Sequence, residues 1–176
     1  MNGQKKSRAK ILVSACLVGE RVRYDGMALV CKDRILEYWQ QEDRVLAFCP
    51  EVAAGLAVPR SPAEIIGEGD GTAVLQGLAK VINRDGKEMT EQFVIGARKA
   101  LEQVMAQSIA LAVLKDGSPS CGSSYIYDGS FTGVSEAGKG VTAALFEENG
   151  IRVFNEHQMA EAAAYLTRRV RNAARV

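Results

Sequence analysis

Short apolar runs separated by helical patterns constrain the fold of this chain more than any other feature. Each run has four to six residues, and the segments between them repeat apolar side chains at helical spacing. Strands that are apolar along their whole length are typical of parallel sheets covered on both faces. The runs span residues 10–15, 44–48, 109–114 and 151–154. The sequence therefore predicts an α/β fold, a three-layer sandwich with helices on both faces of a mostly parallel, Rossmann-like sheet.

The remaining segments give expected helices and loops. Apolar spacing predicts helices over residues 28–42, 88–107, 138–149 and 157–173. Prolines and glycines should keep residues 56–72 mostly irregular, and residues 73–84 should form one or two short strands. A brief strand is expected at residues 125–127, inside the long loop 115–133. Long loops within compact domains are often functional.

Length and charge limit the class of protein. The chain has 176 residues, enough for one domain, and we expect a frayed end at residues 1–9 and a single domain over residues 10–176. Its 22 basic and 21 acidic residues nearly cancel, which argues against a broad surface for nucleic acid or membrane. A small-molecule partner is favoured.

The start of the chain contains a pattern that resembles a lipoprotein cleavage box. Leu12-Val13-Ser14-Ala15-Cys16 follows a basic segment, but the apolar stretch before the cysteine covers only residues 11–15. An export signal needs an apolar core of about 7–15 residues. We therefore expect a cytoplasmic protein without disulfides or a membrane span.

Three of the four cysteines follow predicted strands. Cys16 and Cys49 come directly after the first two apolar runs, and Cys121 lies in the loop after the third. Loops at the carboxyl ends of parallel strands share one edge of a sheet. The three thiolates could meet there and hold a metal centre with one open position, as an iron-sulfur cluster with three protein ligands would have. The alternative is that each cysteine is a small buried apolar residue, which is how we interpret Cys31 in the predicted helix 28–42.

A carboxylate accompanies the second of these cysteines. Glu51 follows Cys49 across Pro50, which restricts the backbone between them. Glu51 could serve as a general acid or base beside a bound substrate. The alternative is a solvated loop glutamate.

Polar loop residues supply further candidates for substrate contacts. The loop around Cys121 contains Ser118 and Ser120, and Lys115 precedes it with a positive charge. Such a loop can hydrogen-bond cluster sulfurs, an anion or a polar ring, although hydroxyl-rich loops also occur without a function. Arg60 lies between two prolines and could pair with a carboxylate or phosphate, while Tyr24 could stack on a planar ligand.

At these residues the chain resembles a bacterial family first described as a domain of unknown function, whose characterised relatives include the 2-thiouracil desulfidases. The resemblance runs in order from about residue 11 to residue 156. Its main segments are Ser14-Ala15-Cys16-Leu17-Val18-Gly19, Arg23-Tyr24-Asp25-Gly26, Cys49-Pro50-Glu51, Pro59-Arg60, Ser118-Pro119-Ser120-Cys121-Gly122 and Tyr127-Asp128-Gly129.

The resemblance implies a [4Fe-4S] cluster held by Cys16, Cys49 and Cys121, with the fourth iron open to the sulfur of a thiocarbonyl substrate. It implies that Glu51 and Ser118 are catalytic, through proton transfer and the positioning of water or substrate. The expected function is non-redox desulfuration of a thiolated heterocycle such as 2-thiouracil, with release of sulfide. The alternatives are a cluster-bearing sulfide or persulfide carrier or sensor, and a metal-free binding domain. The resemblance does not fix the substrate.

Overall fold

A four-stranded parallel sheet forms the centre of the protein. The computed structural model describes residues 9–173. The strands are β1 (Ile11–Ser14), β2 (Val45–Phe48), β5 (Leu111–Leu114) and β8 (Val153–Asn155), in the order β2-β1-β5-β8. Every neighbouring pair is parallel. All four were expected from the apolar runs, and the predicted α/β fold is confirmed.

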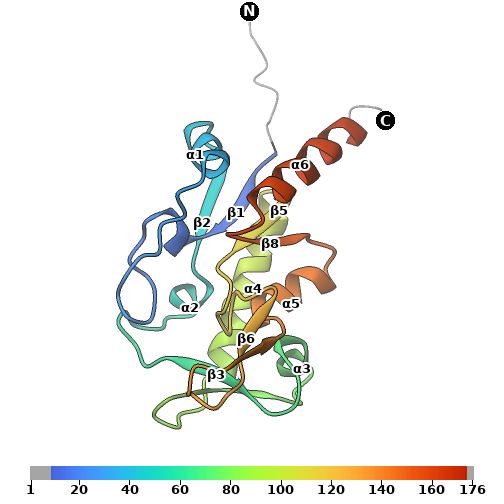
Figure 1. Ribbon diagram of the computed structural model, residues 1–176. Coiled ribbons are helices and arrows are strands. Elements are labelled where there is room, and N and C mark those ends of the chain that lie inside the picture. Colours follow the sequence, from blue (N-terminus) through green and yellow to red (C-terminus); the bar gives the residue numbers. More distant parts are fainter. Residues whose placement is uncertain (1–8, 174–176) are drawn as a thin grey trace, which may run out of the picture.

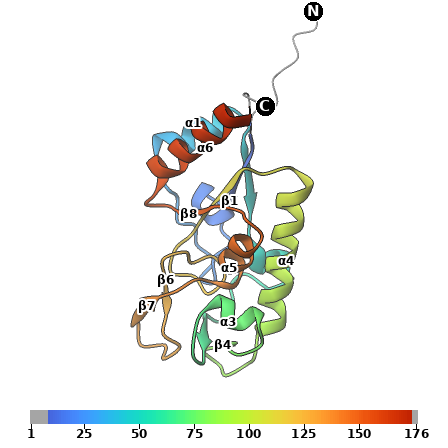
Figure 2. The ribbon, with the colours of Figure 1, turned by 90° about the vertical axis from the view of Figure 1, so that its right-hand side faces the viewer.

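Helices cover both faces of this sheet. α1 (Arg34–Gln41) and α6 (Met159–Ala173) pack side by side on one face, while α4 (Thr90–Ala106) and α5 (Val141–Glu148) cover the other (Figures 1 and 2). Successive side chains of a strand point to opposite faces. Accordingly, Val13 belongs to the core under α1 and α6, whereas Leu12 belongs to the core under α4 and α5.

Two small antiparallel two-stranded sheets lie apart from the central sheet, near the lower end of Figure 1. One pairs β3 (Ala63–Ile66) with β4 (Lys80–Asn83), and the other pairs β6 (Tyr125–Tyr127) with β7 (Ser135–Ala137). Their shared core contains Ile65, Val81, Phe93 and Ile126. The expected strand at 125–127 is confirmed.

The segment before β4 differs from its prediction. Residues 56–72 were expected to be mostly irregular, but they contain the strand β3. In residues 73–84 only one strand, β4, is present, because the helix α3 (Gly71–Leu75) occupies the beginning of this segment. The carboxylate of Asp70 accepts the backbone N–H of Thr72 at 2.8 Å and caps α3. The pairing of β3 depends on β4, so the local pattern of residues 56–72 could not show it.

The first helix is shorter than predicted. Asp33 accepts the backbone N–H of Ile35 at 2.7 Å, which starts α1 at Arg34 rather than at residue 28. The preceding residues bond to the chain near the first cysteine instead, with the Cys31 N–H donating to the Leu17 carbonyl at 2.8 Å. Cys31 therefore precedes the helix instead of lying within it. The other three helices are confirmed within a few residues, and residues 1–8 of the expected frayed end lie outside the described range.

A one-turn helix that the sequence analysis missed links the sheet to α4. This helix, α2 (Pro50–Ala53), begins directly after Cys49 and packs against α4. The contact requires a glycine, because a Cβ atom on Gly96 would lie 2.3 Å from the carbonyl oxygen of Pro50. Gly96 thus fixes the distance between α4 and the segment that carries Cys49 and Glu51.

We predict that Gly96→Ala lowers the free energy of unfolding. In a helix interior this change usually stabilises by roughly 0.5–1 kcal/mol, because alanine has the better helix propensity. Here the added methyl group must displace the Pro50 backbone, and overpacking typically costs about 1–3 kcal/mol. Thermal unfolding followed by circular dichroism measures the change, with Arg98→Ala at an exposed position of α4 as the control. A raised Tm in Gly96→Ala would contradict the close contact.

Candidate active site

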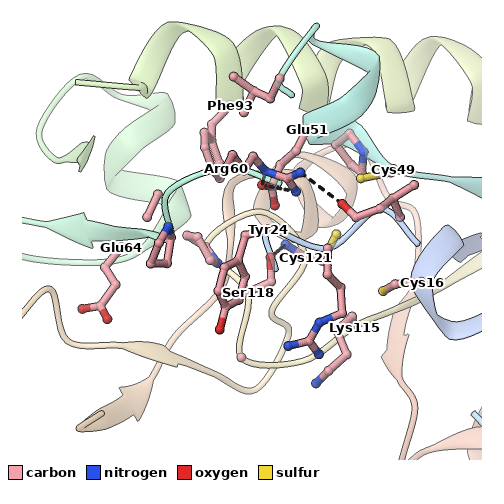
Figure 3. Close-up of a pocket in the computed structure, with 18 of the residues that line it drawn as sticks. Cys16, Tyr24, Cys49, Glu51, Arg60, Glu64, Phe93, Lys115, Ser118 and Cys121 are labelled. Carbon is pink, nitrogen blue, oxygen red and sulfur yellow. Dashed lines mark hydrogen bonds and ion pairs between the residues drawn. The ribbon is translucent and has the colours of Figure 1, made fainter. Parts of the chain in front are cut away.

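The structure brings Cys16, Cys49 and Cys121 to one pocket. Cys16 lies in the 3-10 turn η1 (Ala15–Val18) after β1, Cys49 is the N-cap residue of α2 after β2, and Cys121 lies in the loop after β5. All three line a cavity of about 530 Å³ between the carboxyl edge of the parallel sheet and the two hairpins. Figure 3 shows their sulfur atoms on the same side of this pocket.

The environment of these thiols disfavours their charged form. Burial, together with the neighbouring Cys49, raises the pKa of Cys16 to about 11. Burial raises the pKa of Cys49 and moves the pKa of Cys121 well above its usual range. Cys16 and Cys49 add to the shift at Cys121, so the three groups influence one another electrostatically. A cationic centre among them would remove this penalty, because metal ligation requires the thiolate form.

The donor set fits an iron-sulfur cluster better than a single ion. Thiolates are the soft ligands that Fe–S clusters use. Among the described residues no group of three His, Cys, Asp or Glu side chains converges on one metal ion. A cluster binds each thiolate at a different iron atom, so its ligands lie farther apart than the ligands of one ion. Cys31 does not line the pocket, and its sulfur lies 3.9 Å from the carbonyl oxygen of Glu156.

An arginine holds Glu51 in the pocket wall. The Arg60 guanidinium donates from Nε to Oε2 of Glu51 at 2.8 Å, and its second nitrogen lies 2.7 Å from the same oxygen (Figure 3). The remaining Arg60 contacts go to the carbonyl oxygens of Val22 and Ala57. Within residues 9–173 nothing donates a hydrogen bond to Oε1 of Glu51, which leaves this oxygen for a bound molecule. Arg60 lines the pocket as expected, but its polar atoms orient Glu51 and the neighbouring loops.

Ser118 has its hydroxyl oxygen occupied as an acceptor. The backbone N–H groups of Ser120 and Cys121 both donate to Ser118 Oγ at 3.1 Å. The hydroxyl hydrogen remains to be donated into the pocket that Ser118 lines. Ser118 therefore fixes the Cys121 loop and offers a donor at the same time.

Lys115 and Tyr24 complete the part of the pocket expected from the sequence. Lys115 Nζ lies 2.5 Å from Oε1 of Glu156 and donates to the Asp116 carbonyl oxygen at 2.6 Å. Its charge acts to lower the pKa of Cys16, although burial outweighs it. The ring of Tyr24 is partly exposed beside the guanidinium of Arg23, 5.7 Å from the ring centroid.

Ser120 is the one expected site residue that the structure places outside the pocket lining. Its side chain is 1% exposed, and its hydroxyl is 3.1 Å from that of Thr142. A Cβ atom on Gly140 would lie 2.4 Å from the Ser120 carbonyl carbon, so α5 begins directly against this loop. Contact with α5, instead of with the pocket, accounts for the position of Ser120.

Sequence analysis missed Asp116, a buried carboxylate at the base of the Cys121 loop. Its Oδ1 accepts backbone N–H groups from Ser123 at 2.9 Å and Ser124 at 3.1 Å, and its Oδ2 accepts the Asn155 amide at 2.9 Å and the Ser124 hydroxyl. Burial raises the pKa of Asp116, but these hydrogen bonds outweigh it and hold the pKa below its usual range. An aspartate two residues after the end of a strand and before a glycine-serine loop was the available signal.

Most of the chain matches known proteins. Residues 11–158 match the family model described as 2-thiouracil desulfurase. An uncharacterised protein of Bacillus subtilis (strain 168), YbbK, is 42% identical over 149 residues, which cover 85% of this chain and 97% of that protein.

The fold of the chain also matches that of a solved structure. The structure of TudS, described as a [4Fe-4S]-dependent thiouracil desulfidase, superposes with a TM-score of 0.83 at 48% identity. The match covers 91% of this chain and 99% of the TudS chain. Together with the family match, this similarity shows that the chain belongs to the 2-thiouracil desulfurase family.

Proposed function

We propose that the protein is a [4Fe-4S]-dependent desulfidase that converts the thiocarbonyl group of a heterocycle such as 2-thiouracil to a carbonyl group. The observation that carries the proposal is the meeting of Cys16, Cys49 and Cys121 with Glu51 in one pocket. The reaction adds one water to the C=S carbon and releases the sulfur as sulfide, so carbon and sulfur exchange no electrons with an external partner. A carrier or sensor would have no need of a carboxylate held beside the thiols.

In this proposal Cys16, Cys49 and Cys121 hold the cluster. When bound, the cluster supplies an iron that lacks a protein ligand, a Lewis acid for the substrate sulfur. The three thiols suit this role, since all of them line the same pocket and Cys16 and Cys121 are buried in its wall. Lys115 adds a positive charge next to Cys16, which favours the anionic thiolate and anionic sulfide.

Glu51 is the proposed acid and base. The contacts of Arg60 to Oε2 fix the direction of the carboxylate and leave Oε1 for the attacking water or the ring N–H. Glu51 takes a proton from the water as oxygen adds to the ring carbon and returns a proton as sulfide leaves. Ser118 donates its hydroxyl hydrogen to the oxygen of the attacking water, and Tyr24 contributes an aromatic face at the pocket wall.

Replacement of the proposed ligands tests the cluster site. We predict that Cys16→Ser, Cys49→Ser and Cys121→Ser each lose most of the iron and acid-labile sulfide of anaerobically reconstituted protein, because each removes one of three thiolate ligands. Cys31→Ser is the matched control and should keep both, since Cys31 does not line the pocket. Equal iron loss in all four variants would contradict the assignment.

Replacement of Glu51 tests the proton-transfer role. Glu51→Gln keeps an oxygen that accepts from Arg60 but cannot exchange a proton at neutral pH. We predict unchanged iron content and a loss of about 10² to 10⁴ in the rate of sulfide release from 2-thiouracil. Glu20→Gln, at an exposed position outside the pocket, is the control. Full activity of Glu51→Gln would show that another group transfers the proton, and loss of iron would make Glu51 a ligand.

A further inference from the structure

Phe131 combines an uncommon backbone conformation with a position in the pocket wall. Its φ is 57°, in the left-handed region that side chains other than glycine rarely adopt. The other two non-glycine residues with positive φ within residues 9–173 are Asp43 and Ser108, polar residues in turns after α1 and α4. Phe131 instead lines the pocket, in the turn between β6 and β7. Strained residues of this kind persist mainly where function requires their side chain.

Contacts with the β3–β4 hairpin hold this turn in place. The backbone N–H of Phe131 donates to Oε2 of Glu64 at 3.0 Å, and the Glu64 side chain is buried in β3. The guanidinium of Arg84 lies 5.8 Å from the centroid of the Phe131 ring. A Cβ atom on Gly129 would lie 2.7 Å from the Ile65 carbonyl oxygen, so the turn rests directly on β3. The position of the ring is therefore determined by a second hairpin.

The Phe131 turn belongs to the side of the pocket away from the cysteines. Figure 3 shows Glu64 on the opposite side from Cys16 and Cys49, with Tyr24 and Arg60 between them. Because the backbone N–H of Phe131 bonds to Glu64, the turn lies on this far side, and Phe131 lines the pocket from there. A heterocycle whose sulfur faces the cysteines would present the rest of its ring toward the side of the pocket that Phe131 lines.

We propose that Phe131 is a substrate-binding residue, whose ring forms the wall against which the planar heterocycle of the substrate packs. This proposal rests on the proposed function for the identity of the heterocycle. Stacking of a base on an aromatic side chain contributes to affinity without regard to the chemical step. Loss of the ring should therefore weaken binding of substrate and product alike and leave the rate at saturation nearly unchanged.

Two substitutions separate the ring from the backbone strain. Phe131→Ala removes the ring and keeps the left-handed strain, whereas Phe131→Gly removes both. We expect each variant to bind uracil about tenfold more weakly by calorimetry, and to raise KM for 2-thiouracil by a similar factor with kcat within about twofold of the parent. Phe131→Gly should unfold at the same temperature as Phe131→Ala or higher. Val134→Ala, an exposed neighbour outside the pocket lining, should change none of these values.

Glu64 provides a second test through the anchor of the turn. Glu64→Ala removes the acceptor for the Phe131 N–H and should weaken uracil binding. Glu64→Gln keeps an oxygen acceptor and should restore most of the affinity. If Glu64 has only a structural role, Glu64→Ala should lower the Tm but leave KM and uracil affinity unchanged.

The outcomes distinguish this proposal from the proposed function. Unchanged uracil affinity and KM in both Phe131 variants would overturn the role of the ring, as would a loss confined to kcat. If the reconstituted parent binds uracil but releases no sulfide, the proposed function fails, and calorimetry still decides the role of Phe131. A parent protein that binds neither uracil nor 2-thiouracil would also overturn the proposal.

Discussion

The parallel pairing of β1 with both of its neighbours is the constraint on which the site depends. Ser14 at the end of β1 is level with Phe48 at the end of β2, and Val13 is level with Val113 of β5. The three strands therefore release the chain at one edge of the sheet. Cys16, Cys49 and the Cys121 loop begin there within a few residues of the last strand position. An antiparallel neighbour would have sent one of the three cysteines to the opposite end of the molecule.

Buried charge is handled by pairing within the chain. Two ion pairs of the pocket region are mostly shielded from water, Arg60 with Glu51 and Lys115 with Glu156. Each pair also hydrogen-bonds backbone groups, so neither carries an uncompensated charge into the interior. The three thiols differ in this respect. The positive charges of Lys115 and Arg60 offset only part of the effect of burial on Cys16 and Cys49. The pKa values of all three thiols stay raised, so their neighbourhood favours binding of an external cationic group.

The sequence predicted the central sheet, its four covering helices and the convergence of the cysteines, because these features follow from local apolar patterns and from the geometry of parallel strands. Only the start of the first helix was placed too early. It did not predict β3, whose partner residues in β4 are 14 to 20 positions away along the chain, or α3, which depends on one capping aspartate. Arg60 was expected to reach a ligand, but its bonds to Glu51 depend on how two loops fold together. The roles of Asp116 and Phe131 arise from contacts with distant segments, which a linear pattern does not contain.

Asp116 has a consequence for how the proposed cluster would assemble in the pocket. Many small metal sites are disordered until the ion binds, and part of the binding free energy is then consumed in ordering the chain. Here the backbone N–H groups of Gly117, Ser123 and Ser124 already have a carboxylate acceptor, and Asn155 attaches that carboxylate to β8. The shape of the loop that presents Cys121 is thus determined by the polypeptide itself. A cluster held at Cys121 would therefore assemble on, and dissociate from, a loop that is already folded, without coupling to the folding of that loop.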